Sequence, residues 1–81
     1  PPKCQPFTEL RSSTWVVNSN CADADGRVTQ IEYKFDDNGV PRVFKTYSQT
    51  ILFNASKFPS LNIDIKAFDD SGEFVETSAQ Y

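Results

Sequence analysis

Two stretches of the chain alternate apolar and polar residues, and this pattern constrains the fold more than any other feature. In the first stretch, Ile31, Tyr33 and Phe35 alternate with polar neighbours. In the second, residues 61–68, apolar side chains again occupy every other position. Such alternation is typical of β-strands that bury one face. No stretch carries apolar residues at helical spacing over three turns, so the sequence predicts an all-β protein.

Turn signals divide the rest of the chain into short strands. Asn38-Gly39 is the strongest of them, because both residues accept the positive φ angles of a type I′ hairpin turn. Pro41 follows it and cannot donate a backbone hydrogen bond, which favours a sheet edge for the next strand. The predicted strands are 7–10, 15–17, 28–35, 42–48, 50–55, 61–68 and 73–81. Seven short strands with such turns predict an immunoglobulin-like Greek-key β-sandwich.

The length of the chain predicts one domain. Its 81 residues include seven Phe, three Tyr and one Trp, which supply enough apolar volume for a single core. We expect residues 1–6 to form an extended, proline-containing linker and residues 7–81 to form the sandwich. The inward phase of the strands predicts the buried set Trp15, Ile31, Tyr33, Phe35, Ile51, Phe53, Leu61, Ile63 and Ile65. Since the sequence starts at Pro1 without an initiator Met, we expect it to be part of a longer or processed chain.

The two cysteines are predicted to form a disulfide. If residues 7–10 and 15–18 pair as a hairpin, the numbers of opposite residues sum to about 25. Cys4 and Cys21 have the same sum, so the register of the hairpin brings them face to face. The alternative is a pair of buried free thiols. A disulfide would place the protein in an oxidising compartment.

The charge distribution argues against two classes of partner. Eight basic residues are scattered among eleven acidic ones, whereas a nucleic-acid or anionic-membrane surface needs clustered Lys and Arg. The longest apolar runs are too short for a bilayer-spanning segment or a signal peptide. We therefore expect neither nucleic-acid binding nor membrane insertion.

Three segments together resemble a known class of modules: Asp23-Ala24-Asp25-Gly26-Arg27-Val28, Ile31-Glu32-Tyr33 and Ile63-Asp64-Ile65-Lys66-Ala67-Phe68-Asp69-Asp70-Ser71-Gly72. Bacterial Ig-like and PKD-type domains resemble them in having a D-x-D-G turn, a V-x-x-V/I-x-Y strand and a strand ending in A-x-D-x-x-G. The chain lacks the W-D-F-G-D-G segment of PKD domains, of which residues 33–39 are a loose counterpart. The resemblance implies a non-catalytic accessory module that spaces or supports a neighbouring hydrolase or adhesin domain. It also implies a secreted or cell-surface location, extracellular or periplasmic.

Two acidic turns suggest a metal site. In an immunoglobulin-like topology, the turns at residues 23–26 and 69–72 lie at the same end, so Asp23, Asp25, Asp69 and Asp70 would converge. Carboxylate oxygens are the ligands that Ca²⁺ prefers. Two alternatives remain: the four residues are solvated turn residues, or residues 21–32 are an EF-hand loop. The EF-hand is disfavoured because Cys21 replaces its first ligand and its flanks favour strands.

Catalytic sites find little support in the sequence. The chain has no His, which excludes Ser-His-Asp and Cys-His arrangements. Asp70-Ser71-Gly72 matches the D-S-G of aspartic proteases, but polar neighbours replace the apolar setting that such sites need. We therefore predict that the protein is not an enzyme.

Carbohydrate binding is the main alternative function. Tyr33, Phe44 and Tyr47 could form an aromatic platform for sugar rings of a polysaccharide or a cell surface, although a small domain needs most of its aromatics in the core. The other alternative is a calcium-stiffened linker in an adhesin. The preferred prediction is a spacer or supporting module whose partners are the neighbouring domains of its parent protein.

Overall fold

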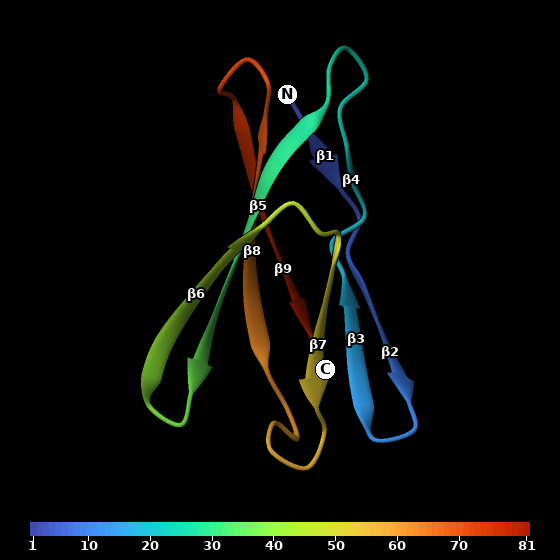
Figure 1. Ribbon diagram of the computed structural model, residues 1–81, viewed down its shortest axis with the longest axis vertical. Coiled ribbons are helices and arrows are strands. Elements are labelled where there is room, and N and C mark those ends of the chain that lie inside the picture. The colour runs from blue at the N-terminus through green and yellow to red at the C-terminus, as the bar shows by residue number, and fades with distance from the viewer.

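The computed structural model describes residues 1–81 and consists of antiparallel strands joined by turns (Figure 1). It contains no helix that could span a membrane. The strands are β1 (Lys3–Cys4), β2 (Phe7–Arg11), β3 (Thr14–Asn18), β4 (Cys21–Ala22), β5 (Val28–Asp37), β6 (Val40–Thr46), β7 (Thr50–Asn54), β8 (Asn62–Asp69) and β9 (Phe74–Gln80). The all-β prediction is confirmed, and each of the longer strands overlaps one predicted range.

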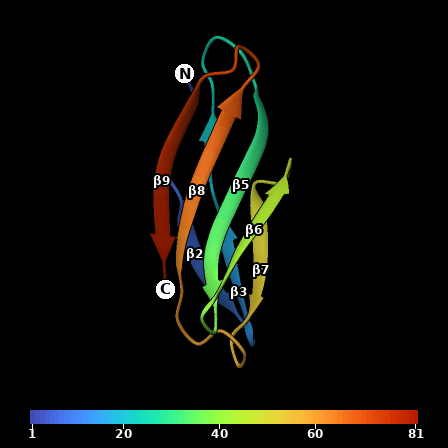
Figure 2. The ribbon, with the colours of Figure 1, turned by 90° about the vertical axis from the view of Figure 1, so that its left-hand side faces the viewer.

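Two sheets pack face to face in an elongated molecule, as the side view in Figure 2 shows. One sheet has the order β2-β3-β7 and the other has the order β6-β5-β8-β9. The short strands β1 and β4 pair as a separate ribbon. The molecule measures 39 × 25 × 16 Å, and its long axis follows the strands (Figure 1). β6 lies at a sheet edge, as Pro41 predicts.

The predicted hairpin register is confirmed. Phe7 lies opposite Asn18 and Arg11 lies opposite Thr14, and in the adjoining ribbon Cys4 lies opposite Cys21. Ser12 turns the hairpin with a φ of 55°. Cys4 and Cys21 form the predicted disulfide, so the chain has no free thiol.

The N-terminal segment differs from the predicted linker. Lys3 and Cys4 form β1, which pairs with β4, and the side chain of Pro2 is among the fully buried ones. Residues 1–6 are extended as expected, but the disulfide and the β1–β4 ribbon hold them against the sandwich. Two-residue strands are too short to produce a sequence pattern, which is why the ribbon was not predicted.

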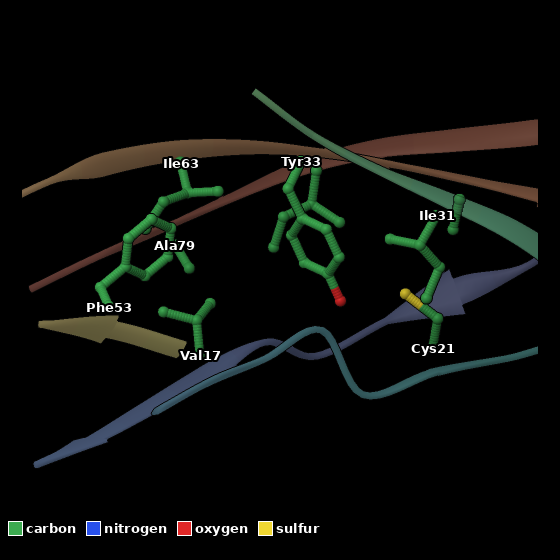
Figure 3. Packing of buried hydrophobic residues seen from close by; sticks show 9 residues of the cluster. Val17, Cys21, Ile31, Tyr33, Phe53, Ile63 and Ala79 are labelled. Carbon is green, nitrogen blue, oxygen red and sulfur yellow. The ribbon is translucent and has the colours of Figure 1, made fainter. Parts of the chain in front are cut away.

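The core lies between the two sheets and is small (Figure 3). Its buried hydrophobic residues are Val17, Cys21, Ile31, Tyr33, Phe53, Ile63, Ile65, Ala67 and Ala79. Five of the nine predicted core residues are in this set, and the remaining four, Trp15, Phe35, Ile51 and Leu61, pack against it while partly exposed. These four keep part of their surface exposed because so small a protein has too little chain to cover its whole core.

Tyr33 is the largest fully buried side chain, and its hydroxyl group is satisfied. The hydroxyl donates to the Ser48 carbonyl oxygen at 2.9 Å and lies 3.1 Å from Ser19 Oγ. Gln49 extends this buried network: its Oε1 accepts from Ser19 Oγ at 2.7 Å, and its Nε2 donates to the Cys21 carbonyl at 2.8 Å. The network joins the β6–β7 connection to the chain beside the disulfide.

Candidate metal centre

Two acidic turns meet at one end of the sandwich, which we call the acidic pole: residues 23–26 between β4 and β5, and residues 69–73 between β8 and β9. The pairing of β5 with β8 places them there, because Val28 lies opposite Asp69 at the end of the ladder. The backbone amide of Asp70 donates to the Arg27 carbonyl at 3.1 Å and fixes one turn against the other. Both loops lie at the top of Figures 1 and 2, close to the N-terminus.

Three carboxylates of the pole converge. Asp23, Asp69 and Asp70 each offer one oxygen atom, and these oxygens all lie within 4.8 Å of one another. The convergence of the two turns therefore agrees with the sequence prediction for these three residues. Asp25 does not belong to this group, and its side chain is exposed.

The two central carboxylates are buried to nearly the same degree but have different partners. The side chain of Asp23 is 3% exposed to solvent and that of Asp69 is 2% exposed. Asp69 Oδ1 accepts three hydrogen bonds, from the Ser71 amide, the Ser71 hydroxyl and the Glu73 amide, at 2.8–2.9 Å. Asp23 Oδ1 is fully buried and accepts none. A buried carboxylate oxygen without a donor is costly unless a cation or another group compensates it.

These surroundings shift the two pKa values in opposite directions. A hydrogen bond between the side chains of Asp23 and Asp25, together with burial and the negative charge of Asp25, raises the pKa of Asp23 above 3.8. Burial alone would raise the pKa of Asp69, but the hydrogen bonds from Ser71 and Glu73 outweigh it and lower the pKa. Asp69 is thus held as a carboxylate, whereas the ionised form of Asp23 is disfavoured.

Gly26 makes room for the cluster. A Cβ atom at this position would collide with Asp70 Oδ1 and would lie 2.9 Å from Asp23 Oδ2. Gly26 does not have a positive φ, so its backbone conformation does not require glycine. The reason for a glycine here is the space that its missing side chain leaves. The sequence indicated a turn glycine but not this spatial role.

The first residue of the sequence lies beside the pole. The backbone nitrogen of Pro1 is 3.9 Å from Asp23 Oδ1, from Asp69 Oδ2 and from Glu73 Oε1. At this distance it donates no hydrogen bond to any of them. The start of the chain therefore passes directly beside the acidic pole, and the sequence gave no signal that Pro1 and Glu73 would lie there.

The donor set is that of a hard-cation site. Three carboxylate oxygens within 4.8 Å of one another are close enough to share one Ca²⁺ ion, which takes six to eight oxygen ligands at about 2.3–2.6 Å and completes its shell with backbone carbonyls and water. No thiol or imidazole lies in the group, so softer transition metals have no preferred ligand there.

The predicted aromatic platform is wrong. Tyr33 is fully buried and its ring lies in the core, because it is on the inward face of β5 (Figure 3). Phe44 is half exposed and lines an apolar groove between β6 and β7. Tyr47 is 86% exposed and lies in a different shallow cleft beside Arg27. The three rings therefore share no surface on which a sugar could stack.

Comparison with known proteins identifies the fold. No family model matches the sequence, and no curated protein matches it either. Among solved structures, the PKD1 domain of Vibrio anguillarum Epp superimposes with a TM-score of 0.71, covering 99% of this chain and 89% of that one. The chain has a PKD-type Ig-like fold.

The structural match confirms the predicted immunoglobulin-like class and the PKD-type resemblance at the level of the fold. The two sequences share 14% identity, so the likeness concerns the arrangement of the strands. In this chain the sandwich contains a Cys4–Cys21 disulfide and a small buried core.

Proposed function

We propose that this PKD-type domain is a non-catalytic module that spaces or supports a neighbouring domain of an exported bacterial protein. The positions of the two chain ends carry the proposal. Pro1 lies at the acidic pole beside Asp69, the last residue of β8. Tyr81 lies near the other end of the same strand, where its backbone exchanges two hydrogen bonds with Leu61.

This geometry suits a spacer. A neighbour attached at each end is held apart by about the length of β8, which is roughly 27 Å at the rise of an antiparallel strand. The two ends lie toward opposite ends of the long axis in Figure 1. The disulfide supports an exported protein, because such bonds persist in oxidising compartments.

The spacer proposal is tested by placing residues 1–81 between two reporter domains and measuring their separation by small-angle scattering and energy transfer. We expect the reporters to lie farther apart than in a direct fusion, by about 27 Å. An unrelated sandwich of the same length should give the same separation. Equal separations in the inserted and direct fusions would contradict a spacing role. Retention of the isolated domain on an insoluble polysaccharide would instead favour a carbohydrate-binding module.

A second function, divalent-cation binding at the acidic pole, is favoured by one observation. Asp23 Oδ1 is buried without a hydrogen-bond donor next to two further carboxylates. A Ca²⁺ ion bound by Asp23, Asp69 and Asp70 would satisfy this oxygen and relieve the repulsion. It would also join the two turns and stiffen the end at which the chain enters. Calcium should therefore raise the melting temperature of the domain.

A further inference from the structure

The disulfide closes a loop that contains most of one sheet. Cys4 and Cys21 are 17 positions apart, and β2 and β3 lie between them. Only β7 of the three-stranded sheet lies outside this loop. Tension that reaches Cys4 therefore passes through the sulfur atoms to Cys21, without entering the β2–β3 hairpin.

Beyond Cys21 the chain leads into the other sheet. It passes the acidic turn and becomes β5, which pairs with β8 from Val28↔Asp69 to Lys34↔Asp64. β8 in turn pairs with β9 from Asn62↔Gln80 to Phe68↔Phe74. Strand β9 leads to Tyr81, which is tied down by its hydrogen bonds with Leu61 and by stacking on Trp15 at 4.5 Å.

A pull on the two ends loads these ladders in shear. The start of β5 is drawn toward the acidic pole and the end of β9 is drawn toward the opposite end, with β8 between them (Figure 1). The ladder hydrogen bonds are perpendicular to the strands, so strands that slide along their axes must break several bonds together. The β5–β8–β9 ladders therefore offer high resistance.

Without the disulfide, tension enters a weaker element first. Strand β2 is at the edge of its sheet and pairs only with β3, over five residue pairs. Four of its five residues are exposed, so little packing holds it in place. It would be the first strand to carry the pull.

We propose that the Cys4–Cys21 disulfide is a mechanical bypass, which directs tension into the β5–β8–β9 ladders and shields the β2–β3 hairpin. The inference rests on the proposed spacing function, because a spacer between two domains transmits the forces that act on them. The disulfide then does more than stabilise the fold: it selects the sheet that bears load.

The test is single-molecule force spectroscopy of residues 1–81 held between identical marker domains. The oxidised chain is compared with the Cys4→Ser/Cys21→Ser double variant. We expect the variant to unfold at a lower peak force. Its extension on unfolding should be about 55 Å longer, because the 17 Cα-to-Cα steps from Cys4 to Cys21 are released. Equal peak forces in the two chains would overturn the proposal.

Two proline variants that keep the disulfide test the load path even if the double variant fails to fold. Glu9→Pro removes a ladder bond inside the shielded hairpin, where Glu9 lies opposite Val16. Thr77→Pro removes one in the β8–β9 ladder, where Thr77 lies opposite Ile65. We expect Thr77→Pro to lower the peak force and Glu9→Pro to leave it unchanged. If Glu9→Pro lowers it as much, the hairpin bears load and the bypass is rejected.

The force measurement tests the bypass, and the reporter-separation measurement tests the spacer, so either proposal can be rejected without the other. Equal forces with the expected reporter separation would reject the bypass and leave the spacer. A force difference without added separation would reject the spacer, while the load path through the disulfide would stand.

Discussion

Asp23 and Asp69 show how far local hydrogen bonding decides the behaviour of a buried carboxylate. Both side chains are almost completely enclosed at the same pole. Asp69 receives three donors from its own turn, while Asp23 Oδ1 receives none. The donors from Ser71 and Glu73 lower the pKa of Asp69, whereas the neighbouring Asp25 carboxyl group and burial raise the pKa of Asp23. The same substitution at the two positions should therefore have opposite effects on stability.

Asp23→Asn should raise the free energy of unfolding at pH 7 in the absence of divalent cations, and Asp69→Asn should lower it. The raised pKa of Asp23 means that its contribution is most favourable below its unfolded pKa and is lost as the pH rises through the folded value. The lowered pKa of Asp69 means the reverse: its contribution is present above about 3.8 and is lost as the pH falls. Urea unfolding of both variants between pH 2 and 7 measures this. A loss of stability at pH 7 in both variants would contradict the opposite assignments.

At the scale of strands, the alternation of apolar and polar residues predicts which face of a strand is buried, but it does not predict where the strand begins or how its first residues are hydrogen-bonded. The inward phase of β8 was readable because Ile63, Ile65 and Ala67 alternate with polar residues, and all three are buried. The start of β6 was predicted at residue 42 but lies at Val40, because the two-residue turn passes directly into the ladder. At the start of β7, the Ser48 hydroxyl accepts a hydrogen bond from the Thr50 amide and donates one to the Thr50 carbonyl. No sequence pattern reports such a contact, since it depends on where the preceding loop turns.

The register of β8 predicts a large effect at Ile63 and a small one at a similar residue on an outward face. Ile63 has no exposure and packs in the core, so Ile63→Ala should cost about 2–5 kcal/mol in the free energy of unfolding. Leu52 in β7 is 63% exposed, and Leu52→Ala should change it by less than about 0.5 kcal/mol. Urea denaturation of the two variants provides the comparison. Similar losses in both would mean that the two faces of the sandwich are wrongly assigned.

At the scale of the whole molecule, topology brought together what is distant in sequence. The convergence of residues 23–26 with residues 69–73 could be predicted, because an immunoglobulin-like sandwich places these connections at one end. The membership of the cluster could not, because it depends on side-chain direction. Asp25 is exposed and lies outside the group of three, whereas the missing side chain of Gly26 leaves room for the carboxylates of Asp23 and Asp70. The aromatic platform failed for a related reason: Tyr33 was needed inside a core that has few other large residues.

Because the acidic pole joins both turns to the entry point of the chain, a cation bound there should stabilise the whole domain. Extracellular modules bind Ca²⁺ with dissociation constants of about 10⁻⁴–10⁻³ M, so 10 mM calcium, a roughly ten- to hundredfold excess, should raise the melting temperature by at least about 5 °C. Asp70→Asn removes one of the three carboxylate charges that would hold the ion and should abolish most of the rise. Glu76→Gln removes the same charge from an exposed position on β9 and should preserve it. An equal rise in both variants would mean that calcium acts on the general negative charge of the protein, and the site would be rejected.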